Sequence, residues 1–201
     1  MSVEIAEKVE ESQIVEAVEG LLKAIKDRGK KVKDTYEVNN VWITLDRPNY
    51  EMEKGEVKKY FNSRVKKGKN DSTFEAKMHQ EKAHYEYLKW GLIQKVEYNK
   101  FNFGEQPLNS RKICVHSEDC ISLIQVMFRL ENKTFVNAYM RSTEITQLLP
   151  IDLLGIVDIV DGLIEEIKLL SFRKDLQINI IIGSAHIYLE NDIRRLKYED
   201  L

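Results

Sequence analysis

The residue whose type and position most suggest chemistry is Asp152, because it lies in the most apolar stretch of the chain. From Pro150 to Leu170 nearly every residue is Ile, Leu or Val, which predicts a buried helix. Its polar residues recur at helical spacing on one side, which predicts a solvent-facing stripe of Asp158, Asp161, Glu165 and Lys168. At about 100° per residue, Asp152 falls on the opposite, apolar side.

An acid on the buried side of a core helix is costly unless another group satisfies it. Asp152 is therefore a candidate for a paired or ligand-binding carboxylate. The alternative is that Pro150 is the first helical residue and that Asp152 only supports the N-terminus of the helix.

The remaining reactive side chains give weaker signals by themselves. Cys114 and Cys120 are too close and too few for a disulfide framework, and no Cys/His spacing is typical of a zinc site. His79 and His84 do not share a helix face, which predicts surface or packing roles. The basic run at 66–69 predicts a solvated loop, with a phosphate site as the alternative.

Bulk composition bounds the class of protein. The chain has 201 residues, 43% hydrophobic and 32% charged, with a net charge of −2, which predicts one globular domain over residues 1–201. Near-neutral charge does not indicate nucleic-acid binding, and the longest apolar run is interrupted by acids, unlike a membrane span. The polar, acidic N-terminus does not resemble a signal peptide, so we expect a cytoplasmic protein.

The hydrophobic pattern predicts an α+β fold, in which a mixed sheet packs against the long buried helix. The expected helices are 12–26, 56–65, 74–89, 150–170 and a short one after residue 191. The expected strands are 38–45, 111–116, 120–130, 134–140 and 177–182, the last continuing to Tyr188. Strands 120–130 and 134–140 should form a hairpin, and residues 99–110 should be turn-rich.

Four short motifs occur in an order that resembles the thymidylate synthase family, which includes the pyrimidine hydroxymethylases. They are Asn109-Ser110-Arg111-Lys112, the stretch from Cys120 to Gln125, Arg141-Ser142 followed by Leu149-Pro150-Ile151-Asp152, and Ala185-His186-Ile187-Tyr188. The family pattern is a paired-Arg strand, a nucleophilic Cys with a Gln five residues on, an Arg-Ser pair, Leu-Pro with Asn or Asp beyond, and His-x-Tyr. The chain is most similar to compact archaeal- or phage-type members.

The resemblance implies a specific site in a homodimer. Cys120 would be the nucleophile that adds to C6 of a pyrimidine nucleotide, with 5,10-methylenetetrahydrofolate as the one-carbon donor; the alternative for this thiol is a small buried apolar residue. Reactivity needs a lowered thiol pKa, which Arg141 would supply. The resemblance implies that Arg141 and Ser142 bind the nucleotide phosphate, and that Arg111 and Lys112 reach the phosphate bound by the partner subunit. It implies that His186 and Tyr188 bind the sugar. Gln125 would lie near the nucleotide or have a structural role.

The chain departs from the family pattern mainly at the folate positions. Lys112 replaces the second Arg, Ser184 stands where Asp is frequent, and Glu144 replaces the Asp that contacts the pterin. Gln147-Leu148 replaces the usual Leu-Gly. The catalytic Glu of the first half is not placed among Glu53, Glu56, Glu75 and Glu81. The family's Tyr-Gly motif corresponds to Tyr85 with Gly91 or to Phe103-Gly104.

Asp152 bears on which base is bound. In uracil-specific members the matching residue is an amide, whereas members with Asp at this position resemble the cytidylate hydroxymethylases. A carboxyl group can accept a hydrogen bond from the cytosine amine and, when protonated, can donate one to N3. The resemblance therefore favours hydroxymethylation of a cytosine nucleoside monophosphate. Thymidylate synthesis from dUMP is the first alternative, and a non-catalytic nucleotide-binding homologue is the second.

Overall fold

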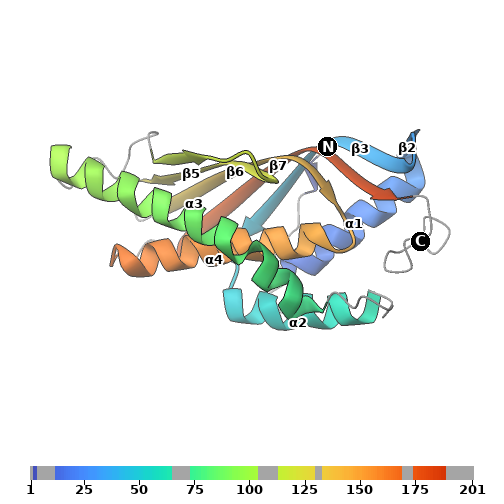
Figure 1. The fold of residues 1–201 in the computed structure, drawn as a ribbon, viewed down its shortest axis with the longest axis horizontal. Helices are drawn as coiled ribbons and strands as arrows, with labels where there is room; N and C mark the ends of the chain where they lie inside the picture. The colour runs from blue at the N-terminus through green and yellow to red at the C-terminus, as the bar shows by residue number, and fades with distance from the viewer. Residues whose placement is uncertain are drawn as a thin grey trace.

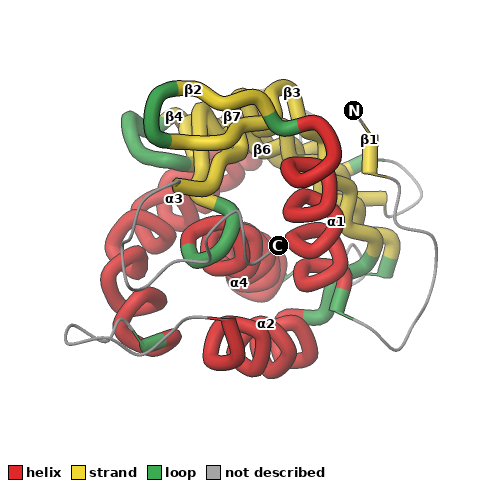
Figure 2. Tube along the Cα trace, turned by 90° about the vertical axis from the view of Figure 1, so that its right-hand side faces the viewer, coloured by secondary structure: helices red, strands yellow, loops and turns green. Residues whose placement is uncertain are grey.

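The apolar stretch around Pro150 forms α4 (Leu148–Glu166), and the other elements are arranged around this helix. The computed structural model describes residues 2–3, 12–64, 73–103, 113–129, 133–168 and 174–188. In these residues one seven-stranded sheet has four helices on one of its faces (Figures 1 and 2). The predicted α+β class, with a mixed sheet against a long buried helix, is confirmed.

Three more helices surround α4. They are α1 (Gln13–Arg28), α2 (Tyr50–Arg64) and α3 (Phe74–Phe103). The prediction of turns from Asn99 onward was wrong for the first residues, since α3 runs on to Phe103. The residues that disfavour a helix, Gly104 and Pro107, come only after that point. None of the described helices combines the length and apolar character that a bilayer span requires.

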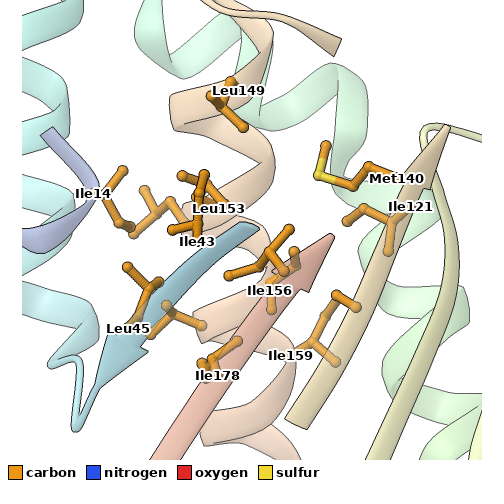
Figure 3. Packing of buried hydrophobic residues seen from close by; sticks show 14 of the residues in the cluster. Ile14, Ile43, Leu45, Ile121, Met140, Leu149, Leu153, Ile156, Ile159 and Ile178 are labelled. Atoms are coloured by element: carbon orange, nitrogen blue, oxygen red, sulfur yellow. The ribbon is translucent and has the colours of Figure 1, made fainter. Parts of the chain in front are cut away.

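Nearly every side of α4 is buried, because the sheet covers one side and the three other helices cover the rest (Figure 2). Figure 3 shows Leu153 and Ile156 of α4 among Ile43, Leu45 and Ile178 of the sheet. Such close packing of branched side chains is the main source of stability in a domain of this size.

The predicted solvent-facing stripe on α4 is only partly correct. Glu165 and Lys168 are exposed, but Asp158 is half-buried and Asp161 is buried. The reason is that α2 and α3 pack on this side of α4, where the Lys89 side chain of α3 lies against Gly162. Helical periodicity locates the polar side of a helix, but it does not show what later packs against that side.

The sheet is mixed, with strand order β1-β3-β7-β6-β5-β4 and with β2 paired to β3. The strands are β1 (Ser2–Val3), β2 (Lys30–Val32), β3 (Thr35–Asp46), β4 (Cys114–His116), β5 (Ile121–Phe128), β6 (Lys133–Glu144) and β7 (Asp175–Tyr188). The predicted β5–β6 hairpin is confirmed. Strands β6 and β7 are parallel and are connected through α4, as a parallel pair requires a crossover. The sequence did not predict β1 or β2, and the expected loop at 66–69 and final helix lie outside the described residues.

A line of irregular positions bends the sheet near the C-terminal ends of β6 and β7. In β7 alternate residues up to Ile182 are buried, but after Gly183 the buried side shifts by one residue to Ala185. In β3, Asn40 has the positive φ of 56° and stands opposite Gly183 without a shift of register, so the ladder is interrupted at this one position of both strands. A Cβ at Gly183 would lie 2.6 Å from the Arg141 carbonyl oxygen, so this close approach requires glycine.

A buried carboxylate joins α1 to α2. Glu53 of α2 is fully buried and accepts hydrogen bonds from the Ser12 hydroxyl, from Gln13 N at 3.1 Å and from Ile14 N at 3.3 Å. Burial raises the pKa of Glu53, and these hydrogen bonds oppose that rise. Glu53 therefore caps the first turn of α1 from another helix, which favours a negative charge at this position.

We expect Glu53→Ala to destabilise the fold by about 1–3 kcal/mol, because it leaves buried donors of α1 without an acceptor. Glu56→Ala is the matched control on the same helix, since Glu56 forms a partly exposed ion pair with Lys59. Its effect should stay within about 0.5 kcal/mol. Urea unfolding followed by circular dichroism measures both, and equal losses would contradict the capping role.

Candidate functional site

The bent end of the sheet gathers most of the residues named from the sequence. Cys120 directly precedes β5, whereas Arg141 and Ser142 lie near the end of its antiparallel partner β6, so both segments reach the same end of the sheet. The chain then enters α4, whose fifth residue is Asp152. His186 is paired with Glu144 in the β6–β7 register and therefore lies at this end too.

Asp152 connects Cys120 to a tyrosine from α3. The Cys120 thiol donates to Asp152 Oδ2 at 3.2 Å, and the Tyr85 hydroxyl donates to Asp152 Oδ1 at 3.0 Å. Asp152 is 3% exposed and Tyr85 is 4% exposed, so the carboxylate is enclosed. Asp152 is thus a paired, buried acid, and the alternative of a helix-end carboxylate does not describe its contacts.

Gly155 makes room for Tyr85. A Cβ at this position would lie 2.4 Å from Cζ of the Tyr85 ring, so the ring packs directly on the α4 backbone. Glycine inside a helix costs about 1 kcal/mol relative to alanine, so this position needs a packing reason. The close approach brings the tyrosine hydroxyl to Asp152, less than one helical turn away on α4.

Burial controls the electrostatics of this group. Desolvation raises the pKa of Asp152 to about 7, and the hydrogen bonds from Cys120 and Tyr85 limit the rise. Desolvation and then the Asp152 carboxylate raise the pKa of Cys120 as well, opposed by a hydrogen bond from Thr143. The lowered thiol pKa that the sequence led us to expect is therefore not present in this state of the protein.

Arg141 contacts the turn that precedes Cys120. Its side chain is exposed, and Nη2 donates to the backbone oxygen of Glu118 in the turn before Cys120. Ser142 contacts the thiol through its backbone, because its carbonyl oxygen lies 3.3 Å from Cys120 Sγ and is a second acceptor for the single thiol proton. The guanidinium thus lies beside the site, with its charge directed at the backbone of the turn.

Glu144 has a structural set of contacts. It is 2% exposed and accepts from Thr146 N at 2.9 Å, from the Thr146 hydroxyl and from Gln147 N at 2.8 Å. These donors directly precede α4, so Glu144 satisfies free N–H groups at the start of that helix. The pterin contact implied by the resemblance therefore stays a prediction.

The four glutamates considered for the catalytic role in the first half of the chain differ in their contacts. Glu53 caps α1, Glu56 pairs with Lys59 at 2.6 Å, and Glu75 pairs with Lys58 at 2.5 Å. Glu81 is different, because its charge raises the pKa of Asp152, Tyr85 and Cys120. Of these four, Glu81 is the one that acts on the site.

The remaining residues implied to bind substrate are distributed unevenly. His186 and Tyr188 lie on one face of β7 with their rings edge to face at 5.3 Å. Gln125 lies farther along β5, in a polar row where Asn137 Nδ2 donates to it at 3.4 Å, which fits a structural role. Arg111 and Lys112 lie outside the described residues.

An open cavity of about 970 Å³ lies between α3 and the turn before Cys120. Its lining consists of Gln80, Glu81, Ala83, His84, Tyr87, His116, Ser117, Glu118 and Asp119. His84 is largely buried and its Nδ1 lies 3.2 Å from Asp119 Oδ2, which agrees with the predicted packing role, and desolvation lowers its pKa. Among the described residues, no three His, Cys, Asp or Glu side chains gather in a way that could hold a metal ion.

Sequence reasoning did not select Tyr85 as a partner of Asp152. The available signal was indirect: Gly155 interrupts a run of large apolar residues on a helix, which is consistent with a bulky side chain packing there. Hydrogen bonds between residues 67 positions apart leave no periodic trace in the sequence. The Cys120–Asp152 contact, 32 positions apart, was hidden for the same reason.

Comparison with known proteins identifies the fold. No protein-family model matches the chain, and no curated protein matches its sequence. Among solved structures, thymidylate synthase from T4 phage has a similar fold, with a TM-score of 0.53 and 14% sequence identity. The match covers 89% of this chain and 80% of that one. The chain therefore has a thymidylate-synthase-like fold.

Proposed function

We propose that this chain is an enzyme that transfers a one-carbon unit to C5 of a pyrimidine nucleoside monophosphate, with Cys120 as the nucleophile. The observation that carries this proposal is the contact of the Cys120 thiol with the buried Asp152 carboxylate at 3.2 Å. A thymidylate-synthase-like fold with Arg141, Ser142 and His186 at the same end of the sheet supports it further.

In this proposal, Cys120 acts as a thiolate that forms a C–S bond to C6 of the ring. The electron pair of the C5–C6 double bond then becomes available at C5, which makes C5 nucleophilic. Methylenetetrahydrofolate supplies the one-carbon unit when it is bound. Burial of the site helps by excluding water from the reacting atoms.

The nucleotide phosphate would be held by Arg141 and Ser142, with Arg111 and Lys112 contributed across a dimer. A guanidinium offers two parallel donors to a phosphate, and the exposed Arg141 side chain can exchange the Glu118 carbonyl for such a ligand. The same movement would bring positive charge toward the nucleotide beside Cys120.

The cavity beside Cys120 fits the ring system of a folate. Its volume of about 970 Å³ is in the range of small-molecule sites. Glu81, Glu118 and Asp119 can accept the N–H donors of a pterin-type ring, and the exposed ring of Tyr87 offers a flat surface. Glu144 is turned to the start of α4, so we assign the folate contact to the cavity instead.

Asp152 supports a cytosine base. Cytosine presents an amine that donates and a ring nitrogen that accepts, so its partner must accept at one atom and donate at another. A protonated carboxyl group does both, and burial raises the pKa of Asp152 to about 7, which makes this form accessible near neutral pH. Hydroxymethylation of a cytosine nucleotide is therefore the reaction that we favour, with methylation of dUMP as the alternative.

The open face of the sheet supports a homodimer. No described element covers this face (Figures 1 and 2), and a cross-strand row on it is largely apolar. The row consists of Trp42, Ile181, Tyr139 and Leu123, in register on four strands. Trp42 is 53% exposed and Tyr139 is 41% exposed, so a second copy could bury both.

One observation favours a second candidate function, a nucleotide-binding homologue that is not catalytic. The Cys120 thiol is neutral in this structure, because burial and Asp152 raise its pKa. The two candidates differ in one test. A live enzyme should form a covalent complex with a 5-fluoropyrimidine deoxynucleotide and methylenetetrahydrofolate, detected by mass spectrometry, whereas a binding protein should not.

Replacing the nucleophile should abolish turnover while nucleotide binding survives. We expect this for Cys120→Ser and Cys120→Ala, because a hydroxyl or methyl group cannot replace a thiolate. Cys114→Ser is the matched control, since Cys114 is a half-buried residue of β4. Tritium release from C5 measures turnover, and calorimetry measures binding. Loss of turnover in Cys114→Ser but not in Cys120→Ser would contradict the assignment.

Asp152→Asn should shift base preference toward dUMP. An amide donates where cytosine needs an acceptor, and an unpaired buried polar group costs about 1–3 kcal/mol, or roughly ten- to a hundredfold in relative efficiency. The measurement is the ratio of kcat/KM for dCMP and dUMP in both proteins. An unchanged ratio, or a wild type that prefers dUMP, would end the cytosine assignment and leave the family-level proposal intact.

Disrupting the open sheet face should weaken the dimer. Trp42→Lys places a charge in the centre of the proposed contact, whereas Tyr98→Lys alters a similarly exposed residue of α3 and serves as the control. Sedimentation equilibrium should show a higher dimer dissociation constant for the first variant only.

Mixing inactive Arg111→Ala and Cys120→Ala proteins should restore partial activity, because a mixed dimer would contain one site with both residues intact. A wild type that is monomeric at micromolar concentration would refute the shared site.

A further inference from the structure

A continuous chain of polar contacts runs from Tyr85 through Asp152 to Cys120 inside an otherwise apolar region. Each carboxylate oxygen receives one hydrogen bond, from the Tyr85 hydroxyl at 3.0 Å and from the Cys120 thiol at 3.2 Å. Both donors are neutral groups. A buried carboxylate stabilised only by neutral donors is a far stronger base than one in water, because desolvation penalises its charged form.

We propose that Asp152 is the base that removes the thiol proton of Cys120, and that Tyr85 is a positioning residue that directs the carboxylate at the sulfur. In this step the S–H bond of Cys120 breaks and an O–H bond forms on Asp152 Oδ2. A neutral thiol and a carboxylate become a thiolate and a neutral carboxyl group, so the charge of the pair stays at −1. No other reactant is needed.

The geometry assigns the two oxygens of Asp152 different tasks. Tyr85 is held in place because its ring packs on the backbone of Gly155, where a Cβ would come within 2.4 Å of the ring. Its hydroxyl occupies Oδ1, which leaves Oδ2 toward the thiol. Cys120 Sγ is in turn held between Asp152 Oδ2 and the Ser142 carbonyl oxygen, at 3.2 and 3.3 Å. The donor and the acceptor are therefore already in contact.

This inference deepens the proposed function and rests on it for the identity of the substrate. The transferred proton stays on Asp152, which can then donate to a ring nitrogen that lacks a proton, as in cytosine. One proton would thus both release the nucleophile and prepare the carboxyl group for the base. The proton transfer itself belongs to the free protein and can be measured without substrate.

The charged groups that act on Asp152, apart from this pair, come from α3. Glu81 raises the pKa of Asp152, and Lys77 lowers it. Both effects are smaller than those of burial and of the two hydrogen bonds. Glu81 acts in the same direction on Cys120 and Tyr85. The pH response of the pair should therefore be governed mainly by the enclosure of Asp152.

The test is the pH dependence of Cys120 alkylation by iodoacetamide in Cys114→Ser protein, without nucleotide. If the proton is shared, the rate should rise through the neutral range as the pair loses its first proton. It should then level off, because the thiolate fraction of the singly protonated pair is constant. Asp152→Asn should lose the neutral inflection and show one steady rise at alkaline pH.

Tyr85→Phe separates positioning from packing. It keeps the ring against Gly155 but removes a hydrogen bond that lowers the pKa of Asp152, so the neutral inflection should shift to higher pH. Tyr98→Phe, which alters an exposed tyrosine of the same helix outside the cavity, should leave the profile unchanged. Infrared spectra give a second readout, in which the band of the protonated carboxyl group should fade across the same neutral range.

The proposal would be overturned if wild type and Asp152→Asn both showed a single alkaline rise, or if Asp152→Asn were simply faster at every pH with the same shape of profile. In either case Asp152 would only raise the thiol pKa. A normal inflection without turnover on any pyrimidine nucleotide would instead refute the proposed function and leave the proton transfer standing. Turnover on a pyrimidine nucleotide without the neutral inflection would refute the proton transfer and leave the proposed function standing.

Discussion

The enclosure of α4 is the constraint on which the rest of the molecule depends. A helix covered by a sheet on one side and by three helices on the others offers little surface for polar side chains before its last turn, and a polar side chain in its first turns is buried at a cost. Asp152 can remain there only because Tyr85 and Cys120 donate to it. Its pairing therefore fixes the position of α3 against α4 through Gly155, and the position of the turn before β5 against the end of β6.

Three of the buried acids, Glu53, Glu144 and Asp152, show how similar side chains acquire different roles. Glu53 and Glu144 accept backbone N–H groups at the starts of α1 and α4, where the free donors of a helix favour negative charge. Asp152 accepts only side-chain donors, one of which is ionisable and reactive. The identity of the donors, more than burial itself, distinguishes a structural carboxylate from one that can exchange a proton.

The sequence predicts the architecture well because its signals are local. The helix around Asp152, the β5–β6 hairpin and the buried position of Asp152 each depend on neighbouring residues, and all three are confirmed. Two features could not be read in this way. The shift of the buried side at Gly183 coincides with an irregular position in the neighbouring strand β3, and the contacts of Asp152 join segments distant in sequence. The helix α3 continues through Asn99 to Phe103, so residues that are frequent in turns did not end it, and Gly104 and Pro107 follow only after its last residue.

A neutral Cys120 thiol is compatible with the proposed role of Cys120 as a nucleophile, because of the net charge that the site can hold. In a low-dielectric environment, a carboxylate and a thiolate side by side would place two negative charges in contact, which is strongly unfavourable. Sharing one proton avoids that state, and moving the proton between Asp152 and Cys120 changes no net charge. In the proposed enzyme, Arg141, whose guanidinium donates to the Glu118 carbonyl, would therefore bind the phosphate without first having to activate the thiol. On this argument, the enclosure that raises the pKa of Cys120 is also what keeps its base within reach.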